Sequence, residues 1–164
     1  DEEGFHFYEM GYRVGGGQSS ILLDKINGVD YVKMLINFAL TGKMCDEKDW
    51  NRVTPDFDKY ACGLVVLIKP GIITKIEGLD QLESFDDIVK ITQYYQIGDS
   101  VQEKLVGTLG QTFARIHIVS NNVSSFLYML NSINSTLKIL DENGENLLLS
   151  VVCQKFKKHL NNLK

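Results

Sequence analysis

The chain has 164 residues, 17 Lys and Arg against 21 Asp and Glu, a formal net charge of −4, and a hydrophobic content of 44%. These values fit a globular domain with a core of its own, and the lack of a basic stripe argues against nucleic acid or an anionic membrane as the main partner. The sequence also lacks a visible signal peptide and any apolar run near the ~20 residues of a membrane span.

An acidic residue ends the first apolar segment. If Phe5 to Met10 form a strand, its period of two puts Phe5, Phe7 and Glu9 on one face. Burying an unpaired carboxylate is costly, so Glu9 should pair with a cation or coordinate one. An extended path onward brings Arg13 to the same side, where its permanently charged, planar fork suits carboxylate or phosphate oxygens.

A glycine loop follows, formed by Gly15, Gly16, Gly17 and Gln18. Glycines let a ligand approach the main chain closely, so acid, base and loop would share one small volume. Two simpler interpretations stay open: the acid and the base pair with each other or with distant partners, and the glycines only form a hairpin turn. The segment is neither a phosphate-binding P-loop, since no Lys-Ser or Lys-Thr follows, nor a dinucleotide fingerprint.

Residues 27–43 have the apolar spacing of an amphipathic helix, with Gly42 as its C-cap. The apolar stripe consists of Val29, Val32, Leu35, Ile36, Ala39 and Leu40. The polar stretch from Met44 to Lys59 is then expected to be a connection.

The second half of the chain alternates strands with helices. Strands are predicted over 62–69, 72–76, 88–95 and 112–119, a short helix opens at Asp80, and a longer helix is capped by Asn122. The stripe of that last helix is Val123, Phe126, Leu127, Leu130 and Ile133. This order predicts an α+β fold with a mostly antiparallel sheet.

The tail from Leu147 to Leu163 is predicted to be an amphipathic helix that docks on the body or on a partner chain, which leaves a homo-oligomer open, and membrane binding is the weaker alternative. Arg115 and His117 share one face of the 112–119 strand, and that face is either a second site or, as we expect, the solvated or interface side of the strand.

The three cysteines are far apart and lack metal-ligand spacing. They indicate reduced thiols in a cytoplasmic protein. The histidines are too scattered to argue for zinc, and no Ser/His/Asp or Cys/His set has the context of a nucleophile.

The run of an apolar strand, Glu9-x-x-x-Arg13 and a glycine loop resembles the last conserved strand of the ATP-grasp ligases, usually Glu-x-Asn-x-Arg followed by a glycine-containing loop. The segments 69–101 and 107–133 are also similar to the C-terminal domain of the carboxylate-amine ligase and carbamoyl-phosphate-synthase-like enzymes. The resemblance makes Glu9 a magnesium ligand and Arg13 the phosphate contact. Gly11 replaces the usual metal-binding Asn, so one or two metal ions remain open.

The resemblance implies an ATP-dependent ligase that joins a carboxylate to an amine through an acyl phosphate, with ATP and Mg2+ as cofactors and with Gly15 to Gln18 binding substrate. The chain begins with DEEG rather than Met, and we expect a fragment that is inactive alone. We predict three parts: an ATP-grasp remnant over 1–45, an α+β domain over 46–146, and a helix over 147–164. The rival hypotheses are a non-catalytic folding or oligomerisation module and a small-molecule-binding regulatory domain.

Overall fold

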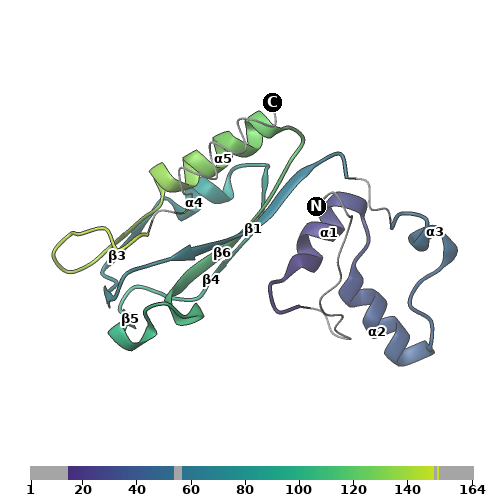
Figure 1. Cartoon of the computed structure of the whole chain (residues 1–164), viewed down its shortest axis with the longest axis horizontal. Helices are drawn as coiled ribbons and strands as arrows, with labels where there is room; N and C mark the ends of the chain where they lie inside the picture. Colours follow the sequence, from purple (N-terminus) through teal and green to yellow (C-terminus); the bar gives the residue numbers. More distant parts are fainter. Residues whose placement is uncertain (1–14, 54–56, 150, 152–164) are drawn as a thin grey trace, which may run out of the picture.

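The computed structural model describes residues 15–53, 57–149 and 151 (Figure 1). The predicted strand from Phe5 to Met10, with Glu9, and the nearby Arg13 lie outside the described residues, as does the predicted helix beyond residue 151.

Three helices precede the strands. They are α1 (Ser19–Asn27), α2 (Tyr31–Thr41) and α3 (Glu47–Trp50). The elements that follow are β1 (Tyr60–Leu67), β2 (Gly71–Ile72), β3 (Lys75–Glu77), α4 (Leu79–Glu83), β4 (Ile88–Gln93), β5 (Ser100–Val101), two 3-10 turns (Glu103–Leu105 and Leu109–Gln111), β6 (Thr112–Ser120), α5 (Val123–Thr136) and β7 (Lys138–Leu140).

The main sheet has β6 at its centre. The strand order is β1-β6-β4, and both neighbours run antiparallel to β6. Two small antiparallel pairs, β2-β5 and β3-β7, extend the structure at one end. The predicted α+β class with a mostly antiparallel sheet is therefore confirmed.

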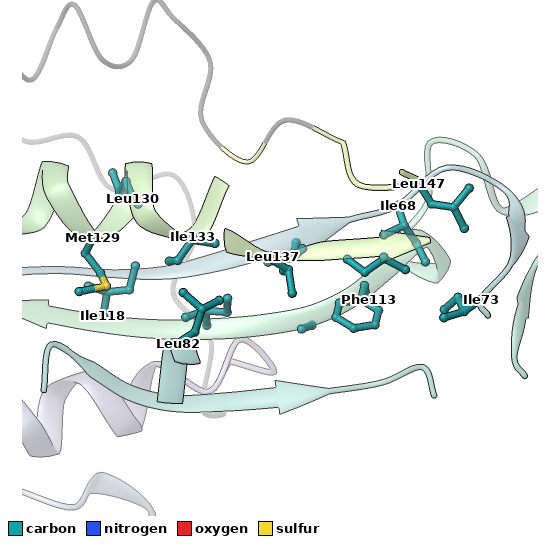
Figure 2. Close-up of a cluster of buried hydrophobic side chains, with 14 of the residues drawn as sticks. Ile68, Ile73, Leu82, Phe113, Ile118, Met129, Leu130, Ile133, Leu137 and Leu147 are labelled. Atoms are coloured by element: carbon teal, nitrogen blue, oxygen red, sulfur yellow. The ribbon is translucent and has the colours of Figure 1, made fainter. Parts of the chain in front are cut away.

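The core lies between α5 and one face of this sheet (Figure 2). Asn122 caps α5 as predicted, because its side chain accepts a 2.9 Å hydrogen bond from the Ser125 amide. The buried stripe of α5 is Val123, Phe126, Met129, Leu130 and Ile133. It differs from the predicted stripe at two positions: Met129 is buried although it was not predicted, and Leu127 packs at the edge of the core and is only partly buried.

A bulge in β6 completes this core. Val66 pairs with Ala114 and Leu67 with Thr112, so Phe113 has no counterpart in β1. An extra residue of this kind turns its side chain away from the regular alternation. Phe113 is fully buried in the core, close to Leu137 in Figure 2.

The segment predicted as one strand over 72–76 is divided between two partners. Ile73 exchanges backbone hydrogen bonds with the 98–99 turn, whereas the Thr74 amide donates to Leu140. The chain thus changes its partner strand between Ile73 and Thr74, which separates β2 from β3.

The predicted tail helix is wrong at its start. Leu147 is buried, and its carbonyl accepts a 2.8 Å bond from the Lys69 amide. The Leu149 amide donates to Leu67, and Leu148 forms an antiparallel bridge with Ile68. Residues 147–149 are therefore extended, because their backbone groups pair with the end of β1 and the side chains of Leu147 and Leu148 pack in the core.

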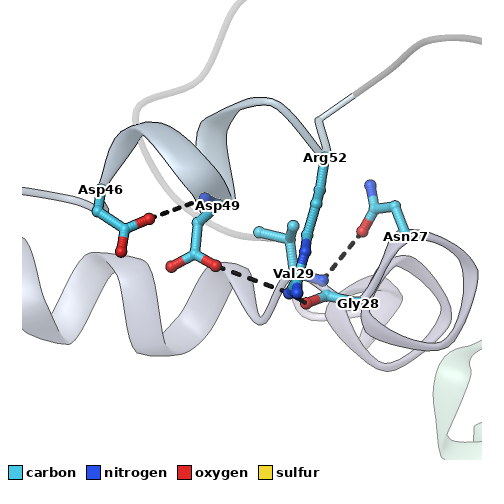
Figure 3. A network of polar contacts seen from close by, with 6 residues as sticks. All are labelled: Asn27, Gly28, Val29, Asp46, Asp49 and Arg52. Carbon is cyan, nitrogen blue, oxygen red and sulfur yellow. Dashed lines mark hydrogen bonds and ion pairs between the residues drawn. The ribbon is translucent and has the colours of Figure 1, made fainter.

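A polar network holds α3 against the end of α1 (Figure 3). Asp46 caps α3 by accepting a 2.8 Å bond from the Asp49 amide, and Arg52 lies 3.7 Å from the Asp49 carboxylate. The Arg52 guanidinium also donates to the carbonyl of Gly28, the residue that ends α1. The expected connection over 44–59 thus contains a short helix tied to α1.

The helix predicted over 27–43 is shorter than expected and mostly exposed. Asp30 caps α2, Gly42 ends it as predicted, and Met34 is its one buried residue. The apolar side chains that stay exposed are Val32, Leu35, Ile36, Phe38 and Leu40. The predicted stripe therefore does not form a buried face within the described residues.

Gly78 offers a sharp test of this packing. It joins β3 to α4 with φ of 88°, and a Cβ there would overlap the Thr136 carbonyl at the end of α5. Gly98 has a similar φ of 95°, but nothing lies within 4 Å of its added Cβ. The two glycines share the backbone strain and differ in the clash.

We expect Gly98→Ala to lower the free energy of unfolding by about 1–2 kcal/mol through the left-handed conformation alone. Gly78→Ala should cost roughly 1–3 kcal/mol more because the Thr136 backbone must move. Urea denaturation of both variants checks this, and equal losses would show that α4 and α5 are not packed as described.

Candidate functional site

The glycine loop lies on the sheet face opposite the core. Strand alternation directs Arg115 and His117 of β6 to this face, while Ile116 and Ile118 enter the core. The His117 Nε2 atom lies 3.4 Å from the Gly17 carbonyl oxygen. A Cβ added at Gly17 would be 3.7 Å from the Arg115 guanidinium. The β6 strand therefore supports the loop directly.

Gln18 fixes the end of the loop. Its φ of 58° makes it the one non-glycine residue with a left-handed backbone in the part of the chain that the structure describes. The Gln18 side-chain oxygen accepts a 3.2 Å bond from the Thr92 hydroxyl of β4. Strained conformations of this kind persist only where the surroundings hold them in place. Contacts to both β4 and β6 provide that hold before α1 begins at Ser19.

His117 is fully buried beneath the loop. Burial lowers the pKa of this imidazole, and the nearby charges of Arg115 and Lys90 lower it further, against the opposing effect of the hydrogen bond to Gly17. The neutral ring uses Nε2–H as the donor to the Gly17 carbonyl. Its Nδ1 has no hydrogen-bond partner within the described residues.

A cavity of about 450 Å³ opens beside the loop. Its walls come from the loop, from the residues after β4, from the turn that precedes β6 and from β6 itself. They are formed by Gly16, Tyr94, Tyr95, Leu109, Gly110 and Arg115. Thr112 also lines the cavity, and its buried hydroxyl lacks a hydrogen-bond partner among the described residues.

The rim of this cavity is held by side-chain amide and hydroxyl groups. The buried Gln111 accepts a 2.6 Å bond from the Gly107 amide and donates a 2.9 Å bond to the Ile68 carbonyl. The Tyr95 hydroxyl donates to the Gly110 carbonyl at 2.5 Å. These bonds fix the 107–111 turn relative to β1 and β4, so the cavity is largely preformed.

The structure brings together only some of the predicted site residues. Gly15, Gly16, Gly17 and Gln18 form the described loop, whereas Glu9 and Arg13 lie outside the described residues. The Arg115 and His117 face was expected to be the solvated or interface side of the strand, and it is an interface within the chain, because the loop and α1 cover that face of β6 and bury His117. Tyr94, Tyr95 and Thr112 were not predicted, since nothing in their local sequence signals a cavity.

The Cys62 thiol, which lies among the described residues, is not activated. Burial raises the pKa of the Cys62 thiol to about 11, which keeps it protonated and a poor nucleophile. Cys45 and Cys62 are free thiols, as expected. Among residues 15–53, 57–149 and 151, no three His, Cys, Asp or Glu side chains are grouped to hold a metal ion. None of the described helices is long and apolar enough to cross a membrane.

Comparison with known proteins identifies the fold. No protein-family model matches the sequence, and no curated protein is similar to it at a significant level. The solved structure of an L-amino acid ligase from Bacillus licheniformis is similar over 81% of this chain, with a TM-score of 0.64 and 15% identity. A phosphoribosylglycinamide synthetase from Anaerococcus prevotii is similar over 79%, with a TM-score of 0.61 and 20% identity.

Both of these proteins are ATP-grasp enzymes. The chain has an ATP-grasp fold. It spans about a third of each enzyme, since the match covers 32% of both chains. The resemblance carried by the glycine-loop sequence is thus confirmed for the fold.

The buried histidine of this ATP-grasp region should make its stability depend on pH. Because the folded pKa lies below the unfolded value of about 6.5, the unfolded chain gains a proton that the folded chain resists as the pH falls through 6.5. The contribution of His117 to the free energy of unfolding is therefore complete above pH 6.5. It is lost progressively as the pH falls from 6.5 to the folded pKa.

The matched variant is His117→Gln, which keeps a side-chain N–H donor for Gly17 but cannot titrate. We expect the wild-type chain to lose more stability than this variant between pH 7.5 and 5.5, measured as urea midpoints. Parallel losses in the two proteins would contradict the neutral, buried imidazole. The remaining histidines and carboxylates are common to both proteins and cancel in the comparison.

Proposed function

We propose that the chain is the C-terminal part of an ATP-dependent ligase that joins a carboxylate to an amine through an acyl-phosphate intermediate. The observation that carries the proposal is the fold similarity to two ATP-grasp enzymes, one of which is an L-amino acid ligase. The glycine loop supports it, since His117 holds the loop backbone at Gly17 and Thr92 holds the Gln18 side chain. A substrate-binding loop needs such preorganisation.

In this proposal the residues before the loop act on the phosphates of ATP. Arg13 contacts the transferring phosphoryl group, where its planar fork stabilises the developing charge. Glu9 supplies the carboxylate oxygen that Mg2+ prefers. When bound, Mg2+ would neutralise charge on the phosphates. Gly15, Gly16, Gly17 and Gln18 bind substrate through the main chain.

The rest of the proposal concerns the whole enzyme. Its partners are a nucleotide, a small carboxylate and an amine, and it works in the cytoplasm. The proposed parts are 1–45 for the ATP-grasp remnant, 46–146 for the sheet domain and 147–164 for the tail. Because this chain spans about a third of each similar enzyme, we propose that the two lobes needed to grip ATP require additional protein.

The 164-residue chain by itself should release no phosphate from ATP in the presence of a panel of carboxylates and Mg2+. The expected result is a rate equal to that of buffer, because one wall of a nucleotide site cannot exclude water or position the phosphates. A colorimetric phosphate assay on the purified chain measures it. Turnover above the buffer rate would contradict the division of the active site.

In the intact enzyme, Arg13→Lys should lower kcat about 100-fold with a smaller effect on KM, since an ammonium cannot reproduce the planar fork where charge develops. Trapping the acyl phosphate with hydroxylamine, which displaces phosphate and leaves a hydroxamate, locates the loss in the first half-reaction.

Arg52→Lys is the matched control, because the structure places Arg52 in the contact between α3 and α1. It should leave kcat unchanged. If Arg13→Lys instead lowers the melting temperature and keeps kcat, Arg13 is a structural partner of Glu9. A fully purified enzyme that forms no hydroxamate with any carboxylate would favour the non-catalytic module.

A further inference from the structure

Among the described residues, the cavity beside the glycine loop contains a cation without a counter-charge. Arg115 is half-buried in its wall, and within the described residues its guanidinium has neither a hydrogen-bond acceptor nor an acidic partner. The part of the cavity lining that the structure describes includes no Asp or Glu. A guanidinium that cannot lose its proton and lies in a partly desolvated wall favours an anion beside it.

The opposite walls are aromatic and apolar. Tyr94 and Tyr95 directly follow β4, and Leu109 lies on the rim formed by the turn before β6. The Tyr95 hydroxyl is already bonded to Gly110, so the ring is fixed in place. A volume of about 450 Å³ is within the usual range for small-molecule sites. The shape and chemistry suit an organic body of modest size rather than an inorganic ion.

We propose that this cavity binds a small carboxylate with an aromatic or apolar body, whose carboxylate pairs with Arg115 and whose body packs against Tyr94, Tyr95 and Leu109. The ligand would also contact the backbone of Gly16, which lines the same cavity. Binding of a ligand in the cavity would therefore change the surroundings of the glycine loop directly. The proposal does not depend on ligase activity, because binding to this chain is measured without ATP.

The charge of the site favours a carboxylate over a phosphate ester. Arg115 is the single cation in the described lining. The adjacent His117 is held neutral by its burial, so it adds no second charge at neutral pH. A monoanionic carboxylate matches one guanidinium through two parallel hydrogen bonds, whereas a dianionic phosphate usually requires more donors.

The test uses phenylacetate as the probe and phenylacetamide as its neutral counterpart of the same shape. Two-dimensional NMR of the 164-residue chain follows the amide signals of Gly16 and Gly110 during titration. We expect phenylacetate to shift both signals and to bind about tenfold more tightly than the amide, the factor expected for a hydrogen bond to a charged group. Phenyl phosphate is titrated in the same way to compare a phosphate ester with the carboxylate.

Arg115→Gln should remove the preference for the acid over the amide while weak binding of the ring remains. Arg52→Gln, the same substitution at the α3 contact, should keep that preference. If Arg115→Gln fails to fold, the affinities of the wild-type chain for phenylacetate and phenylacetamide still test the proposal. Equal affinities for acid and amide, shifts away from Gly16 and Gly110, or tighter binding of phenyl phosphate would each overturn the proposal.

Discussion

The position of β6 between two different layers is the constraint on which the rest of the structure depends. On one face of β6, Ile116 and Ile118 are buried under α5. On the other face, Arg115 and His117 lie against the glycine loop and α1. A strand that is buried on both faces must satisfy its polar side chains locally. The Gly17 carbonyl does so for His117, which ties the loop to the same strand that carries the core.

Local sequence signals predicted the elements whose cause is local. Asn122 caps α5 and Gly42 ends α2, as their side-chain chemistry indicates, and the apolar runs of β1 and β6 formed strands. The stripe of α5 was also correct except that Met129 is buried and Leu127 only partly so. These features depend on neighbouring residues, so one sequence is enough to recognise them.

The remaining features depend on distant partners. Gln18 starts α1 without a side-chain cap and with a left-handed backbone, held by Thr92, which is 74 positions away in the sequence. No local pattern indicates such a start, and α1 was missed. The segment 147–149 carries a helical pattern, yet its amides pair with the end of β1. The apolar stripe of α2 has the period of a helix, but periodicity does not reveal what covers it.

The candidate site illustrates the same division. Sequence alone indicated the loop, because three consecutive glycines are conspicuous, and it correctly grouped Arg115 with His117 on one face of a strand. It could not show that this face meets the loop. That contact changes the chemistry of both side chains. Burial lowers the pKa of the His117 imidazole, and the nearby charge of Arg115 lowers it further, so the ring beneath Gly17 stays neutral. Arg115 is then the one positive charge in the described lining of the cavity, so the backbone of the loop at Gly16 and a single guanidinium face the same small volume.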